Sequence, residues 1–204
     1  MRRVLKNLPK YRNWNWEPNP KLPLGSFDGY ADSIESAIYL VNREPISEAL
    51  DWIESEIQVM LGMQQADGHI ENWYGEGNFN RTAMLYALMK SGGCRPEVWK
   101  PGVRVGAVHQ GARLYLSLEA PAPLKMRFDY ARHRRTLNFG KNYVRLNEFP
   151  EWFTVDENTL YRLSRGKEER IMLGSELIAG VVLEPGDWTV ESLGPAPYGP
   201  ANKK

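Results

Sequence analysis

Acids, amides, a histidine and an arginine crowd one glycine-containing stretch, Gln65–Arg81, which lies between two helical patterns. Its side chains that can act on a ligand are His69, Glu71, Asn72, Trp73, Tyr74, Glu76 and Arg81. Glycines permit backbone conformations closed to other residues, and loops of this composition often hold sites on a rigid scaffold. The alternative is an ordered connection whose Asp and Asn side chains cap helices and close turns.

Carboxylates gather near the expected helix starts, and those of interest are Asp28, Asp32, Glu35, Asp67, Glu71 and Glu76. Glycoside hydrolysis commonly needs two carboxyl groups a few ångströms apart, one to protonate and one to attack or to activate water. Glu71 and Glu76 are the acid or base candidates, and Asp28 or Asp32 is the candidate partner. Helix capping is the alternative role of Asp32 and Glu35.

The same stretch also carries the residue types of a polysaccharide lyase. Elimination needs a base for the proton alpha to a uronate carboxylate, and His69 or Tyr74 is the candidate. It also needs a group that neutralises the carboxylate, and Asn72 or Arg81 has the right chemistry. Trp73 and Tyr74 either form the stacking floor of a sugar subsite or anchor the loop.

Composition argues against several classes of partner. The net charge of +1 over 204 residues gives no reason to expect a nucleic acid or a membrane surface. No apolar run approaches the roughly 18–20 residues that span a bilayer. The N-terminus lacks the apolar run of a secretory signal, so we expect a cytoplasmic protein if the chain is complete.

Metal and cofactor sites have little support in the sequence. His69, His109 and His133 fall in separate segments, and Cys94 is the single cysteine. Phosphate-loop and serine-elbow signatures are absent, so we expect no metal and no cofactor. Cys94 is either a nucleophile or a buried thiol. The basic cluster Arg132–Arg135 is either a solvated loop or hairpin, or a contact for an acidic glycan.

Three helices are expected in the first half, the first from near Asp28 or Asp32 to Arg43 and the others at about Ser47–Gln64 and Phe79–Lys90. Ile34, Ala37, Ile38 and Val41 form an apolar stripe on the first helix. On the second helix the expected solvated face carries Glu48, Asp51, Glu54 and Glu56. The third is apolar on every side from 83 to 89, which predicts burial all round and suggests helices from another chain or segment. Residues 1–27, with four prolines and with Trp14 and Trp16, are expected to be an extended arm.

After Gly102 the pattern changes to alternation, which predicts antiparallel strands. The expected strands are 103–107, 114–118, 124–128, 144–147, 152–155, 160–163, 170–173, 178–183 and 188–191. The sequence therefore predicts an α+β chain. Its expected parts are a helical part with its arm (1–93), a linker (94–102), an antiparallel β-sandwich (103–194) and a flexible tail (195–204).

Two segments, 23–35 and 67–82, carry a resemblance. Pro23-Leu24-Gly25-Ser26-Phe27-Asp28-Gly29-Tyr30 and Asn72-Trp73-Tyr74-Gly75-Glu76-Gly77-Asn78-Phe79-Asn80-Arg81 resemble the closing helices of an (α/α) toroid. Such toroids occur in bacterial glycoside hydrolases and polysaccharide lyases, where an antiparallel β domain often follows. The resemblance implies a carbohydrate-active protein or fragment that acts on an oligo- or polysaccharide. The alternative is a non-catalytic interaction or carbohydrate-binding module that associates with a second copy or with a partner helical chain.

Overall fold

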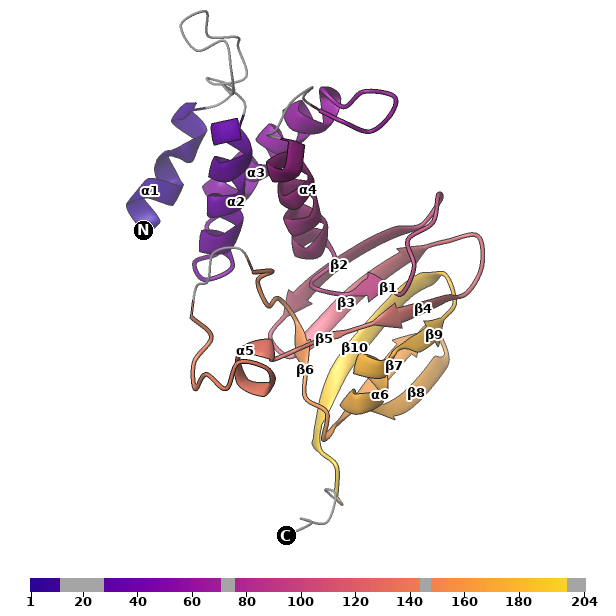
Figure 1. The fold of residues 1–204 in the computed structure, drawn as a ribbon. Coiled ribbons are helices and arrows are strands. Elements are labelled where there is room, and N and C mark those ends of the chain that lie inside the picture. Colours follow the sequence, from indigo (N-terminus) through magenta and orange to yellow (C-terminus); the bar gives the residue numbers. More distant parts are fainter. Residues whose placement is uncertain (12–27, 71–75, 144–147, 198–204) are drawn as a thin grey trace, which may run out of the picture. The chain divides into compact units, whose positions relative to one another are not determined.

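The chain divides into two compact units, Met1–Ala87 and Leu88–Lys204, each described here by itself. The structure is a computed structural model and describes residues 1–11, 28–70, 76–143 and 148–197 (Figure 1). It mixes helices with mainly antiparallel sheets, which confirms the predicted α+β class. None of the described helices has the length and apolar character that crossing a bilayer requires.

Helices make up the first unit. They are α1 (Arg2–Asn7), the 3₁₀ helix η1 (Leu8–Tyr11), α2 (Asp28–Val41), α3 (Ser47–Gly62) and α4 (Glu76–Lys90), whose last residues belong to the second unit. The stripe predicted on α2 is buried as expected, at Ile34, Ala37, Ile38 and Val41. Pro45 follows α2 in the connection to α3, as its missing N–H predicts. The 3.6-residue period therefore identified α3 within two residues at each end and the end of α2 within two residues, and Asp28 is the correct one of its two expected starts.

Two expectations for this unit are wrong. Glu56 is fully buried on α3 beside the apolar stripe, because the buried face of this helix is wider than the stripe alone. The first residues of the expected arm form α1 and η1, and Leu5 of α1 is fully buried. Helix α4 buries Phe79, Thr82 and Leu85 along one face, while Met84 is 53% exposed. This exposure agrees with the expectation that helices outside the described part would be needed to cover α4 on every side. Trp14 and Trp16 lie outside the described residues.

The second unit holds the strands. They are β1 (Arg95–Pro96), β2 (Arg104–Gln110), β3 (Arg113–Glu119), β4 (Leu124–Arg127), β5 (Asp129–Tyr130), β6 (Thr154–Val155), β7 (Thr159–Arg165), β8 (Glu168–Leu173), β9 (Val181–Leu183) and β10 (Gly186–Pro195). Five of them form an antiparallel sheet in the order β2-β3-β10-β7-β8, and three form the sheet β1-β4-β9. The short pair β5-β6 is parallel.

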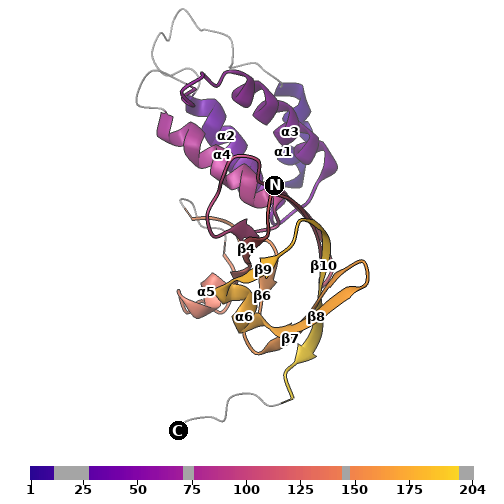
Figure 2. The same cartoon turned by 90° about the vertical axis from the view of Figure 1, so that its right-hand side faces the viewer.

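One face of the five-stranded sheet builds the core of this unit. Leu114, Leu116 and Leu118 alternate inward on β3, and Trp188 and Val190 do so on β10. Buried residues of β4, β9 and the short helix α6 (Gly174–Ala179) belong to the same cluster. The three-stranded sheet and α6 lie on one side of the five-stranded sheet, and no described element of this unit covers the other side (Figure 2). Period-two alternation therefore predicted correctly which face is buried.

Several boundaries in this unit differ from the predictions. The expected linker 94–102 contains β1, which pairs with β4. Residues 178–179 belong to α6 rather than to a strand, because the Glu176 carboxylate accepts the Leu173 N–H at 2.8 Å and closes the first turn. Strand β10 runs to Pro195, inside the expected tail. The expected strand 144–147 lies outside the described residues.

The basic cluster Arg132–Arg135 is a short helix, α5, and two of its side chains turn inward. Arg132 pairs with Asp129, and His133 is 8% exposed. Burial raises the pKa of the Asp129 carboxyl, although Arg132 opposes this effect. The expectation of a solvated loop or hairpin is therefore wrong for these two residues. Sequence neighbours alone do not show that Arg132 and His133 have partly or fully buried partners.

Candidate functional site

The structure describes three of the predicted site side chains, those of Asp32, His69 and Arg81. Glu71, Asn72, Trp73 and Tyr74 lie outside the described residues. Asp28 and Glu76 are the first residues of α2 and α4, and their side chains also lie outside the described part. The roles predicted for these six residues remain predictions.

A closed turn positions His69 after α3. The Gln65 N–H donates to the His69 carbonyl oxygen at 2.7 Å, and the Gly68 N–H donates to the Gln65 carbonyl oxygen at 2.9 Å. Gly68 has a φ of +98°, in the left-handed region that favours glycine. The Gln64 side-chain amide donates to the Gly68 carbonyl oxygen at 2.8 Å. These bonds hold the imidazole on an ordered scaffold.

Asp67 orients the imidazole ring. One of its carboxylate oxygens accepts the His69 backbone N–H at 3.3 Å and contacts Nδ1 of the same histidine. The backbone bond is the main reason that the pKa of Asp67 lies below its ordinary value. Because a carboxylate only accepts, Nδ1 carries the proton in the neutral ring and Nε2 becomes the acceptor. Nε2 is buried and has no hydrogen-bond partner among the described residues. The carboxylate orients the imidazole as it would orient a general base, but a substrate could reach Nε2 only after the groups that bury it had moved.

Arg81 of α4 joins two carboxylates of α2. Its Nε lies 2.5 Å from Oε2 of Glu35 and its Nη2 lies 3.2 Å from Oδ1 of Asp32. The Glu35 side chain is 7% exposed, whereas that of Asp32 is 53% exposed. The Thr82 hydroxyl donates to the Ala31 carbonyl oxygen at 3.0 Å beside this cluster. Arg81 therefore binds α4 to α2, and Asp32 is its solvent-facing partner.

Replacing Arg81 tests how much this pairing stabilises the helical unit. Arg81→Met is expected to lower the free energy of unfolding by about 2 kcal/mol, because it leaves the buried Glu35 carboxylate without this cation. The figure is below the range for fully buried pairs because Arg81 is 35% exposed. Urea denaturation followed by the helical circular-dichroism signal measures the change. Arg104→Met is the matched control, since its pair with Glu119 is 80% and 64% exposed, and it should cost less than about 0.5 kcal/mol. Equal losses in the two variants would contradict the assignment.

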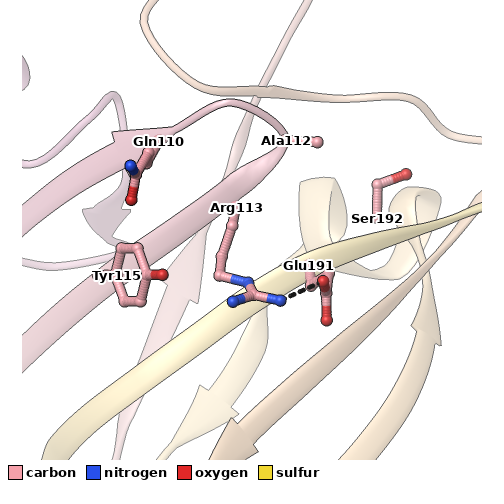
Figure 3. Close-up of a pocket in the computed structure, with 6 residues that line it drawn as sticks. All are labelled: Gln110, Ala112, Arg113, Tyr115, Glu191 and Ser192. Carbon is pink, nitrogen blue, oxygen red and sulfur yellow. Dashed lines mark hydrogen bonds and ion pairs between the residues drawn. The ribbon is translucent and has the colours of Figure 1, made fainter.

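A second cluster of functional groups lies on the uncovered face of the five-stranded sheet. A hollow of about 270 Å³ is lined by Gln110, Ala112, Arg113, Tyr115, Glu191 and Ser192. Figure 3 shows the Arg113 guanidinium between Tyr115 and the Glu191 carboxylate, with which it pairs. Strand alternation predicts that Arg113 and Tyr115 face outward. Their meeting with Glu191, 78 residues further along the chain, depends on the register of β3 with β10.

The thiol of Cys94 does not contribute to either cluster. Cys94 is fully buried, and burial raises the pKa of its thiol well above the usual range. A reactive cysteine needs the opposite shift, so Cys94 is an inert core residue. Within residues 1–11, 28–70, 76–143 and 148–197, no three His, Cys, Asp or Glu side chains converge to hold a metal ion.

Comparison of the chain with models of known protein families, with curated proteins and with solved structures finds no match.

Proposed function

We propose that this chain is a carbohydrate-active protein that acts on an oligo- or polysaccharide, and that His69 moves the proton in the reaction. The observation that carries the proposal is the Asp67–His69 pair, which orients the imidazole and leaves Nε2 as its acceptor nitrogen, in the stretch that also contains Trp73 and Tyr74. Nε2 is buried, so the proposal requires that substrate binding uncover it. The proposal includes the finer architecture, in which α2, α3 and α4 are the closing helices of an (α/α) toroid and the two larger sheets pack as a β-sandwich.

Elimination suits this pair better than hydrolysis. A lyase needs one base, whereas a glycosidase needs two carboxyl groups a few ångströms apart. In the elimination, Nε2 takes the proton alpha to the uronate carboxylate, and the electron pair forms a carbon–carbon double bond. The bond to the glycosidic oxygen breaks, and that oxygen takes a proton from the imidazolium or from water. Because Arg81 is already paired with Asp32 and Glu35, Asn72 is the better candidate to neutralise the uronate.

The test is turnover by the full chain on a panel of polysaccharides. Polygalacturonate, alginate and hyaluronan report elimination through the ultraviolet absorbance of the new double bond, and xylan and mixed-linkage glucan report hydrolysis through new reducing ends. His69→Ala is expected to lower the elimination rate about 100- to 10,000-fold, the usual contribution of a general base. His109→Ala, which replaces an exposed histidine of β2, is the matched control and should leave the rate unchanged. An unchanged rate in His69→Ala would remove His69 from the mechanism.

The second candidate is a non-catalytic module that binds carbohydrate or a partner helical chain. Exposed apolar side chains on the helices favour it, because Met84 of α4 is 53% exposed and Leu61 of α3 is 39% exposed. A second copy or another helical chain would cover them. Binding to a polysaccharide of the panel without any release of double bonds or reducing ends would favour this candidate over the enzyme.

A further inference from the structure

The uncovered face of the five-stranded sheet carries an ordered row of polar side chains. The strand registers place Gln110, Arg113, Glu191, Arg162 and Ile171 opposite one another, one from each strand in the order β2-β3-β10-β7-β8. The neighbouring row begins with Val108 opposite Tyr115. Both side chains are exposed, at 70% and 43%. Side chains on this face therefore lie within reach of a molecule that lies across the strands.

The charges of the row are balanced by one carboxylate within it, Glu191, and by one from the neighbouring row, Glu169. Glu191 pairs with Arg113, and its second oxygen lies 3.6 Å from Nη1 of Arg162. Arg162 in turn pairs with Glu169 at 3.1 Å. Hydrogen bonds to Tyr115 and then to Glu191 raise the pKa of Arg113, so it remains a cation. Two cations matched by two carboxylates leave no net charge that would attract a phosphate or a free carboxylate.

The hollow between β2, β3 and β10 offers balanced donors and acceptors. The Gln110 amide lines it and has no side-chain hydrogen-bond partner among the described residues. Ser192 borders the hollow, but it pairs with Tyr161 in the regular register, so strand alternation places its side chain on the side opposite that of Glu191. Glu191 supplies acceptor oxygens, and the exposed ring of Tyr115 supplies an apolar surface (Figure 3).

We infer that this hollow binds one or two neutral sugar units of a polysaccharide chain. Sugar hydroxyls both donate and accept, which matches the amide and carboxylate groups, and a sugar ring has an apolar C–H face that packs on an aromatic ring. A volume of about 270 Å³ is below that of pockets for drug-sized ligands. An open face of a sheet also suits a chain that continues beyond the hollow on both sides. The inference shares its ligand class with the proposed function but rests only on residues of the second unit.

Isothermal titration of the full chain with xylan, glucomannan and polygalacturonate tests the inference. Binding to a neutral polysaccharide is expected to weaken about five- to tenfold in Tyr115→Ala, the range that a lost aromatic contact implies. Tyr115→Phe keeps the ring and should bind within about twofold of the parent. Val182→Ala is the control, because it removes an exposed apolar side chain of β9, which belongs to the three-stranded sheet and lies outside the hollow. Circular dichroism establishes that each variant is folded.

Three outcomes would overturn the inference. These are absence of binding to both neutral polysaccharides, unchanged binding in Tyr115→Ala, and a clear preference for polygalacturonate, which would mean that the site recognises an anion. His69→Ala separates this inference from the proposed function. Loss of turnover in that variant with unchanged binding to the neutral polysaccharide supports both, and unchanged turnover with a Tyr115-dependent affinity supports the sheet site alone.

Discussion

Gly174→Ala is expected to destabilise the second unit by about 3 kcal/mol or more, at the upper end of what overpacking costs. A Cβ at this position would lie 1.9 Å from the Asp156 carbonyl oxygen and 3.1 Å from Cε2 of Tyr161. Hydrogen bonds hold both groups in place, so moving either one would cost free energy. The Asp156 carbonyl accepts the Thr159 N–H at 3.2 Å, and the Asp156 N–H donates to the Tyr161 hydroxyl at 2.8 Å. Gly174 therefore lets the start of α6 lie directly against the backbone that leads into β7.

Gly106→Ala is the matched control for this prediction. Gly106 lies in β2, where an added Cβ would meet no atom within 4 Å, and its φ is not in the left-handed region. Alanine favours a strand more than glycine does, so the variant should stay within about 0.5 kcal/mol of the parent. Urea denaturation of both variants, followed by circular dichroism, measures the two changes. A loss below 1 kcal/mol in Gly174→Ala, comparable to that of the control, would mean that α6 does not pack as described.

Glu151→Ala is expected to cost about 3 kcal/mol, because it removes the acceptor of a buried hydrogen-bond network. Glu151 is 6% exposed and accepts the His133 backbone N–H at 2.7 Å. It also contacts Nδ1 of His133 at 2.7 Å and accepts from the Asn142 amide at 3.2 Å. Donors left buried without an acceptor cost about 1–3 kcal/mol each, and the carboxylate makes these bonds stronger than neutral ones.

Two variants make the Glu151 measurement specific. Glu157→Ala removes a carboxylate whose pair with Arg135 at 3.1 Å is 44% and 52% exposed, and it should cost less than about 0.5 kcal/mol. Glu151→Gln keeps the shape and one acceptor oxygen, so it should fall between the parent and Glu151→Ala. Thermal unfolding of the three variants gives the order. If Glu151→Ala unfolds like Glu157→Ala, the network contributes nothing to the stability of α5.

One contact of the candidate site joins near neighbours in the sequence, and another joins residues far apart in it. The Asp67–His69 pair joins residues two positions apart, so the Asp-Gly-His sequence already contains it. The two-residue spacing does not predict that Nε2 is buried, because its burial depends on how the rest of the chain packs around His69. Arg81 was predicted as a ligand for a uronate, and its pair with Glu35, 46 residues away, was not predicted. An unpaired and a paired arginine look identical in a sequence.

The buried charges show the same division. Glu56, Glu35 and Glu151 are all buried, although a carboxylate is by default expected at the surface. A glutamate becomes tolerable in the interior only when donors converge on it, and for Glu35 and Glu151 those donors come from other elements. Sequence periodicity places a residue on one side of a helix, but it does not reveal which groups the fold brings to that side.

The sequence by itself determined the α+β class, the positions of α2 and α3, and the face that β3 buries. These features depend on periods of 3.6 and 2.0 residues, which are properties of a few consecutive side chains. Tertiary structure alone decided the order β2-β3-β10-β7-β8, the partial burial of α4, and the hollow that joins Arg113 to Glu191. Their physical cause is pairing between segments far apart in the chain, which local patterns permit in many registers and which only the packed fold reduces to one.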